Sequence, residues 1–222
     1  MQHVKNISAK FEDDPPEWDG ATTFQRVLLS ELDRAVHPMM AKACKAASDW
    51  SRARKNGNRR ASLVLFATEA VGTHATGYGC GKTHIATACL HCDCWAAGDD
   101  VVGPVGKFYD SSELMEELGK RQPPSNIARP DTVIVIDDVG AEQTLEYVAA
   151  GSQEIEMQNR YFRIINHAYS EDVSIVITAN LSLANLMLRL GGRAWSRLQQ
   201  MCPPGCIVDM TGVPDYRVAL RQ

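Results

Sequence analysis

The chain has 222 residues, of which 45% are hydrophobic and 23% are charged, as is ordinary for a soluble globular domain. Its formal net charge of −4 excludes a polycation that coats nucleic acid, so any DNA contact must come from a local basic patch. No apolar run approaches the roughly 20 residues of a membrane span, and the N-terminus lacks the apolar core of a signal peptide. We therefore expect a cytoplasmic protein that makes no membrane contact.

The first 20 residues are acidic and contain prolines, which predicts an irregular lead-in over 1–20 and a single domain over 21–222. Two helical patterns follow. The first covers 24–37 and ends at a proline, and the second covers 38–55 and ends at the turn signal NGN of 56–58.

Five apolar runs of strand length come next, and three of them are apolar throughout, as in strands that are covered on both faces. Helical stretches separate them, which predicts a parallel sheet that binds its ligand at the carboxyl ends of the strands. The expected strands cover 62–67, 105–110, 132–137, 173–178 and 206–210. The expected helices cover 82–97, 111–119, 157–169 and 182–201, the last with a break at Gly191-Gly192.

The seven cysteines are expected to be reduced, because a chain of this size needs no disulfide staples. Cys89, His91, Cys92 and Cys94 are close enough in sequence to suggest zinc. They continue an expected helix, however, and no second ligand pair has the spacing of a zinc finger. We expect packed or partly exposed thiols rather than a metal site.

The stretch ATGYGCGKTH nearly matches the phosphate-binding pattern G-x-x-x-x-G-K-S/T, but Thr76 stands where the first glycine is expected. Backbone N–H groups of such a loop bind phosphate oxygens at the positive end of the next helix. We predict that Lys82 reaches the β- and γ-phosphates and that the Thr83 hydroxyl ligates magnesium. A glycine-rich loop that precedes a helix by chance is the alternative. The predicted nucleotide-binding residues are Gly77, Tyr78, Gly79, Cys80, Gly81, Lys82, Thr83 and His84.

The third apolar run ends in two acids, in TVIVIDDVGAE, which is typical of a Walker B strand. Asp137 is predicted to hold the magnesium ion, and Asp138 to orient the attacking water. An acidic turn after a strand is common by itself. Its position about 50 residues after the GKT sequence favours the catalytic interpretation.

Asn180 follows the fourth expected strand, where a polar side chain can hydrogen-bond the γ-phosphate or the attacking water. The alternative role for Asn180 is an N-cap of the next helix. Ser182 is better placed for that cap, so Asn180 is predicted to be free for a functional role.

Arg193 and Arg197 are four residues apart on the next expected helix and share a face, while Trp195 and Leu198 fall on the opposite face. The pattern predicts that the tryptophan packs inward and that the arginines point outward. Outward arginines are usually solvated. Here they follow Asn180, where ring-forming ATPases place an arginine finger that acts on a neighbour's nucleotide.

These stretches resemble the AAA+ ATPases of the DnaC/IstB group, which are helicase loaders and transposition helpers. The resemblance covers residues 11–218 and is carried by GCGKTHIATA, VIVIDDVGAE, RIINHAYSEDVSIVITANLSLANL, GGRAWSRLQQM and GCIVDMTGVPDYR. It implies an α/β, three-layer P-loop NTPase fold with a five-stranded parallel sheet and no or a truncated C-terminal helical lid. By position, it implies Lys82 and Thr83 as Walker A, Asp137 and Asp138 as Walker B, Asn180 as sensor 1, and Arg197, or less directly Arg193, as the arginine finger.

The resemblance also implies an ATPase that uses ATP and Mg²⁺ and assembles as a homo-oligomer. It implies that the chain binds DNA, for which we expect the single-stranded form, and that its protein partner is a replicative helicase or a transposase. We expect a protein that loads or remodels a helicase in DNA replication. The alternatives are an IstB-like transposition helper and a nucleotide-binding scaffold with weak or no turnover.

The sequence departs from that group in several places. An insertion over 68–77 separates the first strand from the loop, so Gly77 or the inserted segment must make the turn of the missing glycine. A second insertion, over 146–160, lengthens the region after the acidic strand. The chain ends 12 residues after the last expected strand, and little precedes the core, so a helical lid and a helicase-docking domain are expected to be missing.

One dense basic stretch, SRARKNGNRR, can track a phosphate backbone with salt-sensitive affinity. It can equally be a solvated helix end whose charges suit the helix dipole. No aromatic residue interleaves it, so a stacking platform for bases is not predicted. The cations of this basic patch are Arg52, Arg54, Lys55, Arg59 and Arg60.

Overall fold

The computed structural model describes residues 37–70, 77–96, 106–120, 123–130, 132–142 and 152–215, without the side chains of 91–96. The expected lead-in over 1–20 and the expected helix over 24–37 lie outside these residues. So do residues 71–76 of the first insertion, Thr76 among them, and residues 146–151 of the second.

Five parallel strands form one sheet in the order β2-β3-β4-β1-β5, which confirms the predicted α/β fold with a five-stranded parallel sheet. Every expected strand is found within two residues of its predicted ends. The strands are β1 Leu63–Phe66, β2 Gly106–Asp110, β3 Val133–Val139, β4 Ser174–Ala179 and β5 Ile207–Asp209.

The strands are apolar throughout because both faces of the sheet are covered. Alternate residues of β4 enter two separate cores: Val176 packs on one side, and Ile175 and Ile177 pack on the other. β3 repeats the pattern with Val135 on the first side and Ile136 on the second.

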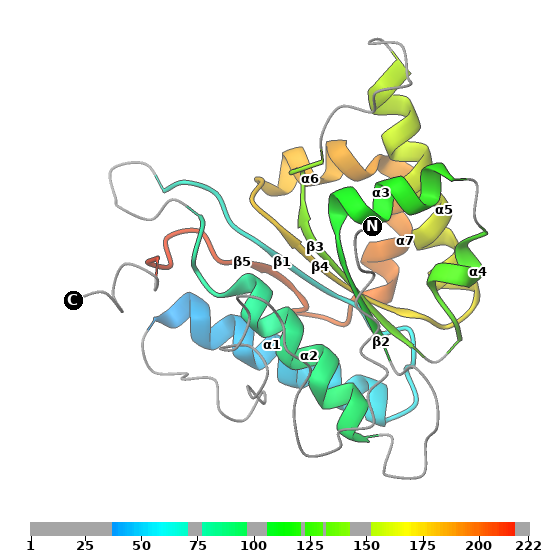
Figure 1. The fold of residues 1–222 in the computed structure, drawn as a ribbon. Helices are drawn as coiled ribbons and strands as arrows, with labels where there is room; N and C mark the ends of the chain where they lie inside the picture. The colour runs from blue at the N-terminus through cyan, green and yellow to red at the C-terminus, as the bar shows by residue number, and fades with distance from the viewer. Residues whose placement is uncertain are drawn as a thin grey trace, which may run out of the picture.

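Helices cover the two faces in three layers (Figure 1). Helices α1 Pro38–Lys55 and α2 Lys82–Ala96 pack on one face of the sheet. The other face is covered by α3 Ser111–Gly119, α5 Gln153–Ser170, α6 Leu183–Leu190 and α7 Gly192–Met201, with the short helix α4 Pro124–Ile127 beside them.

Helix ends follow local sequence signals. Helix α1 spans 38–55 as predicted, with a proline in its first turn and its end at the NGN turn. Ser182 caps α6 by accepting a hydrogen bond from the Asn185 amide, and Gly191, with φ 79°, separates α6 from α7. Both features were predicted.

Helix α5 begins at Gln153 rather than at the expected 157. Acidic residues in its first turn, Glu154 and Glu156, suit the positive end of the helix dipole. Part of the second insertion is therefore the start of this helix. Within the described residues, no helix is long and apolar enough to cross a membrane.

Candidate nucleotide-binding site

The carboxyl ends of β3 and β4 and the start of α2 meet at one edge of the sheet (Figure 1). A chain of hydrogen bonds connects them there. Lys82 Nζ donates to Asn180 Oδ1 at 2.7 Å, and Asn180 Nδ2 donates to Asp138 Oδ1. Beside it, the Thr83 hydroxyl donates to Asp137 at 3.0 Å. We call these five side chains the strand-edge site; the structure brings together the residues that were predicted from three separate motifs.

Lys82 is the first residue of α2, and only 6% of it is exposed. Its ammonium donates to the Gly77 carbonyl oxygen at 2.6 Å, to Cys80 Sγ at 3.3 Å and to Asn180. An ammonium has three donors, so each has a partner within the chain. A buried cation at a helix N-terminus suits a phosphate, which would replace at least one of these partners.

Gly77 makes the turn at the start of the described part of the loop. Its φ is 77°, and a Cβ at this position would lie 2.8 Å from the backbone carbonyl carbon of Thr68. Only glycine fits this conformation and this contact. This geometry fits the first of the two alternatives, a turn made by Gly77; residues 71–76 of the inserted segment lie outside the described residues.

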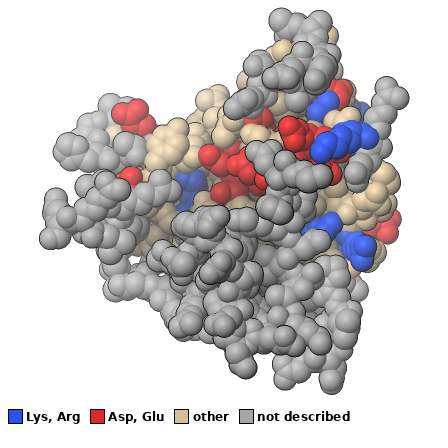
Figure 2. Space-filling view, viewed as in Figure 1, with Lys and Arg blue, Asp and Glu red and all other residues tan. Residues whose placement is uncertain are grey.

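Asp137 is half-buried near the end of β3 and accepts hydrogen bonds from Thr83 and, at 2.6 Å, from Thr178. Burial raises the pKa of Asp137; the two threonine hydrogen bonds oppose this shift, and the charges of Asp138 and Asp110 add to it. Figure 2 shows acidic side chains gathered near the middle of this face. Crowded carboxylates beside a hydroxyl fit a Mg²⁺ ion, which takes few protein oxygens and completes its shell with water and substrate phosphates.

Asp138 adopts a left-handed backbone conformation, with φ 57°, which costs a non-glycine residue about 1–3 kcal/mol. The β3–β4 pairing shifts register between Ile136 and Val139, so the residue sits in a bulge. Thr178 Oγ1 accepts the Asp138 amide at 2.9 Å, and Ser111 Oγ donates to its carbonyl at 2.9 Å. These bonds hold the carboxylate against Asn180.

Sequence reasoning missed Thr178, Ser111 and Asp110. Thr178 contacts both aspartates of the strand-edge site. Asp110 caps α3 and lies opposite Asp137 in the sheet. A polar residue that ends an apolar strand was the available signal for Thr178 and Asp110.

The remaining predicted loop residues have different surroundings. Tyr78 is 56% exposed, and Cys80 is buried against Lys82. Gly79 lies against the carboxylate of Asp215, which follows β5 and was not predicted. Burial lowers the pKa of His84, which favours the neutral imidazole.

Arg193 and Arg197 lie on α7, and within the described residues both contact α5. Arg197 Nε donates to Asn166 Oδ1 at 2.6 Å, and its guanidinium lies 5.4 Å from the ring centres of both Phe162 and Tyr169. Arg193 lies 4.3 Å from the Phe162 ring centre. We call this surface the α7 arginine face. Trp195 and Leu198 are buried on the opposite side of the helix, as predicted.

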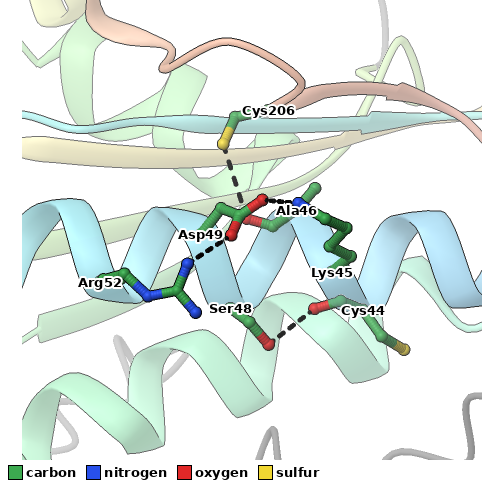
Figure 3. A network of polar contacts seen from close by, with 7 residues as sticks. All are labelled: Cys44, Lys45, Ala46, Ser48, Asp49, Arg52 and Cys206. Carbon is green, nitrogen blue, oxygen red and sulfur yellow. Dashed lines mark hydrogen bonds and ion pairs between the residues drawn. The ribbon is translucent and has the colours of Figure 1, made fainter.

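The basic patch is divided by its contacts. Arg52 pairs with Asp49, which also binds Lys45 (Figure 3). Arg60 lies beyond the end of α1, and its guanidinium lies 4.9 Å from the ring centre of Tyr169 on α5. Of the five cations, Arg52, Lys55 and Arg59 are exposed; Lys55 and Arg59 lie where α1 ends.

Structural comparison finds similar folds in replication proteins. The DnaC helicase loader superposes with a TM-score of 0.59 at 19% identity, over 85% of this chain and 99% of that one. DnaI gives a TM-score of 0.59 at 17% identity, over 86% and 90%. A candidate primosome component from Streptococcus pyogenes serotype M3 gives 0.59 at 15% identity, over 86% and 90%. The chain therefore has the AAA+ P-loop core fold of these proteins.

By sequence, the chain matches no protein-family profile and no curated protein. Its likeness to the helicase loaders is one of fold, together with the motifs described above. Among the described side chains, no group of three or more His, Cys, Asp or Glu is arranged to hold a metal ion. Cys89 is buried in the core, and the side chains of His91, Cys92 and Cys94 lie outside the described ones.

Proposed function

We propose that this chain is an AAA+ protein of DNA replication that binds and hydrolyses ATP and loads or remodels a replicative helicase on DNA. The strand-edge site carries the proposal. Lys82, Asn180 and Asp138 come from three elements and meet in one hydrogen-bonded chain. The fold likeness to the DnaC helicase loader and DnaI supports the choice of replication.

Each residue of the site has a role in this proposal. The loop amides and Lys82 bind the phosphates of ATP, with Lys82 exchanging its bond to the Gly77 carbonyl for a phosphate oxygen. Thr83 and Asp137 hold Mg²⁺, which when bound neutralises phosphate charge. Asp138 accepts a proton or hydrogen bond from the attacking water, and Asn180 fixes the carboxylate.

An arginine from a second copy completes the site in this proposal. Arg197 contacts α5 of its own chain, so we assign its action to the nucleotide of a neighbouring subunit, with Arg193 as the second candidate. A homo-oligomer follows from this assignment. Two exposed cations of the basic patch at the end of α1, Lys55 and Arg59, are the proposed contact for DNA; the third, Arg52, pairs with Asp49.

One observation favours a second candidate, a nucleotide-binding scaffold with weak turnover. All three donors of Lys82 are satisfied within the chain, and binding must break part of that network. The same site would also serve an IstB-like transposition helper, which differs in its partner rather than in its chemistry.

Steady-state ATP hydrolysis, with and without single-stranded DNA, tests the proposal. We expect wild-type turnover well above that of Lys82→Ala, and a loss of about a hundredfold in Asp138→Asn. A wild-type rate as low as that of Lys82→Ala would leave only the scaffold.

Co-purification separates the two enzymatic alternatives. A tagged chain with ATP should retain a hexameric replicative helicase. Retention of a transposase instead would move the assignment to a transposition helper.

A further inference from the structure

Glu142 is a buried carboxylate near the strand-edge site that has no part in the roles above. Its side chain is 1% exposed. Oε2 accepts the Gly140 amide at 3.0 Å and lies 3.6 Å from Arg189 Nε, while Oε1 accepts the Tyr161 hydroxyl. Burial raises the pKa of Glu142, and the Gly140 hydrogen bond and the Arg189 charge oppose this shift. Burying a carboxylate costs free energy, and the two hydrogen bonds and the Arg189 charge offset part of that cost.

The contacts of Glu142 close the turn that carries Asp138. Asp138 and Gly140 both have positive φ, 57° and 106°. The Ala141 amide donates to the Asp138 carbonyl at 3.0 Å, and Glu142 then accepts the Gly140 amide, so the turn is bonded at both ends. A Cβ on Gly140 would lie 2.7 Å from the Leu181 side chain, which leaves the turn little room to shift.

Two helices reach the same carboxylate. Tyr161 lies in the middle of α5, and Arg189 lies in the last turn of α6. Helix α6 begins three residues after Asn180, so it is tied to the strand-edge site near its start and, through Arg189 and Glu142, near its end.

We propose that Glu142 is a positioning residue that fixes the left-handed turn at Asp138 and couples it to α5 and α6. The inference rests on the function proposed above, because Asp138 is taken to orient the attacking water. Glu142 acts only through the turn; its own carboxylate oxygens are occupied by Gly140, Tyr161 and Arg189.

A positioning role and a merely structural role predict different results. Loss of a structural contact would lower stability and would affect nucleotide binding and turnover alike. Loss of a positioning contact lowers kcat and leaves affinity intact, because a misplaced group costs rate at the transition state.

The test compares Glu142→Gln with Glu171→Gln, a matched change at an exposed glutamate after α5. We expect kcat for ATP to fall about tenfold or more in Glu142→Gln, with affinity for a fluorescent ATP analogue within about twofold of wild type. Amide hydrogen exchange over 138–142 should be faster than in wild type. Glu171→Gln should match wild type in all three measurements.

Unchanged kcat in a Glu142→Gln variant, beside an active wild type, overturns the inference. Tyr161→Phe removes one donor and keeps the buried ring, so it should show the same pattern more weakly even where Glu142→Gln does not fold; unchanged kcat there also counts against the inference. Absence of ATP turnover in the wild type would instead contradict the proposed ATPase activity. The exchange measurement would then still decide whether Glu142 holds the turn, since unchanged exchange means that it does not.

Discussion

The strand-edge site and the α7 arginine face both gather polar side chains, but they do so in different ways. At the strand edge, Lys82 is almost fully buried, and its partners come from the loop and from Asn180, directly after β4. On the α7 arginine face, Arg193 is exposed, Arg197 is half-buried, and both rest on aromatic rings of one neighbouring helix.

In the proposed function, this difference separates the part of the chemistry that one chain holds from the part that a second chain supplies. The strand-edge site has its cation, its carboxylates and its asparagine in mutual contact. The two arginines lie on a separate element, α7, where Asn166 accepts the Nε–H of Arg197. A guanidinium has five N–H donors, so in the proposed function the other donors of Arg197 bind a phosphate of another molecule.

Of the changes that test this comparison, removal of Arg197 should have the largest effect on ATP hydrolysis. We expect Arg197→Ala to lower ATP hydrolysis by about a hundredfold or more while ATP binding persists, because an arginine finger stabilises the transition state. Arg193→Ala, the matched change one turn away, should cost less. Unchanged turnover in Arg197→Ala would remove the assignment.

Mixing two inactive variants sharpens the same test. Lys82→Ala lacks a working nucleotide site but keeps Arg197, and Arg197→Ala has the reverse defect. If the arginine acts between subunits, the mixture should regain part of the wild-type rate. No recovery would place the action of Arg197 within its own chain.

Asp137→Asn should have opposite effects on hydrolysis, which needs the Asp137 charge, and on the stability of the fold, which that charge lowers. A carboxyl group whose pKa is raised by folding stabilises the protein only when protonated, and this contribution is lost as the pH rises through the folded pKa. The asparagine keeps an oxygen acceptor for Thr178 without the charge.

We therefore expect Mg²⁺-dependent hydrolysis to be lost while thermal stability without Mg²⁺ rises near neutral pH. A gain of about 1 kcal/mol would raise Tm by roughly 2–4 °C in a chain of this size. The gain should shrink as the pH falls. A lower Tm at neutral pH would show that the buried charge is not a cost.

The basic patch should give the smallest effect. Lys55→Gln together with Arg59→Gln should weaken binding of single-stranded DNA at low salt by a few fold and reduce the salt dependence by roughly one to two units of slope. Lys42→Gln, an exposed lysine on α1 outside the patch, is the control. Equal binding in both variants, measured by fluorescence anisotropy, would make the patch a solvated helix end.

Sequence patterns predicted the parts of the fold that depend on local signals. The ends of α1, the cap at Ser182 and the break at Gly191 follow from single residues with strong backbone preferences. Because Ser182 was predicted to cap α6, Asn180 was predicted to be available for other contacts. Its side-chain amide contacts Lys82 and Asp138.

The contacts between distant segments could not be predicted from the sequence. Aspartate tolerates a left-handed conformation better than most residues, but the sequence does not single out Asp138, whose turn is held by Thr178 of β4 and Ser111 at the start of α3. Arg60 was grouped with the basic patch by proximity in sequence, yet it stacks on Tyr169, which is 109 residues away. The sequence of the basic patch contains no aromatic residue, but folding brings Tyr169 of α5 against it.

Calorimetric titration of ATP with Mg²⁺ into wild type and Lys82→Ala tests the central claim most directly, namely that the strand-edge site is a phosphate cradle. Circular dichroism verifies that the variant is folded, and Lys42→Gln serves as the lysine control. We predict binding by wild type and by Lys42→Gln, and a loss of affinity of at least about thirtyfold in Lys82→Ala, because a buried cation that contacts phosphate is removed. Equal affinity in Lys82→Ala and wild type, or no binding by wild type, would contradict this account.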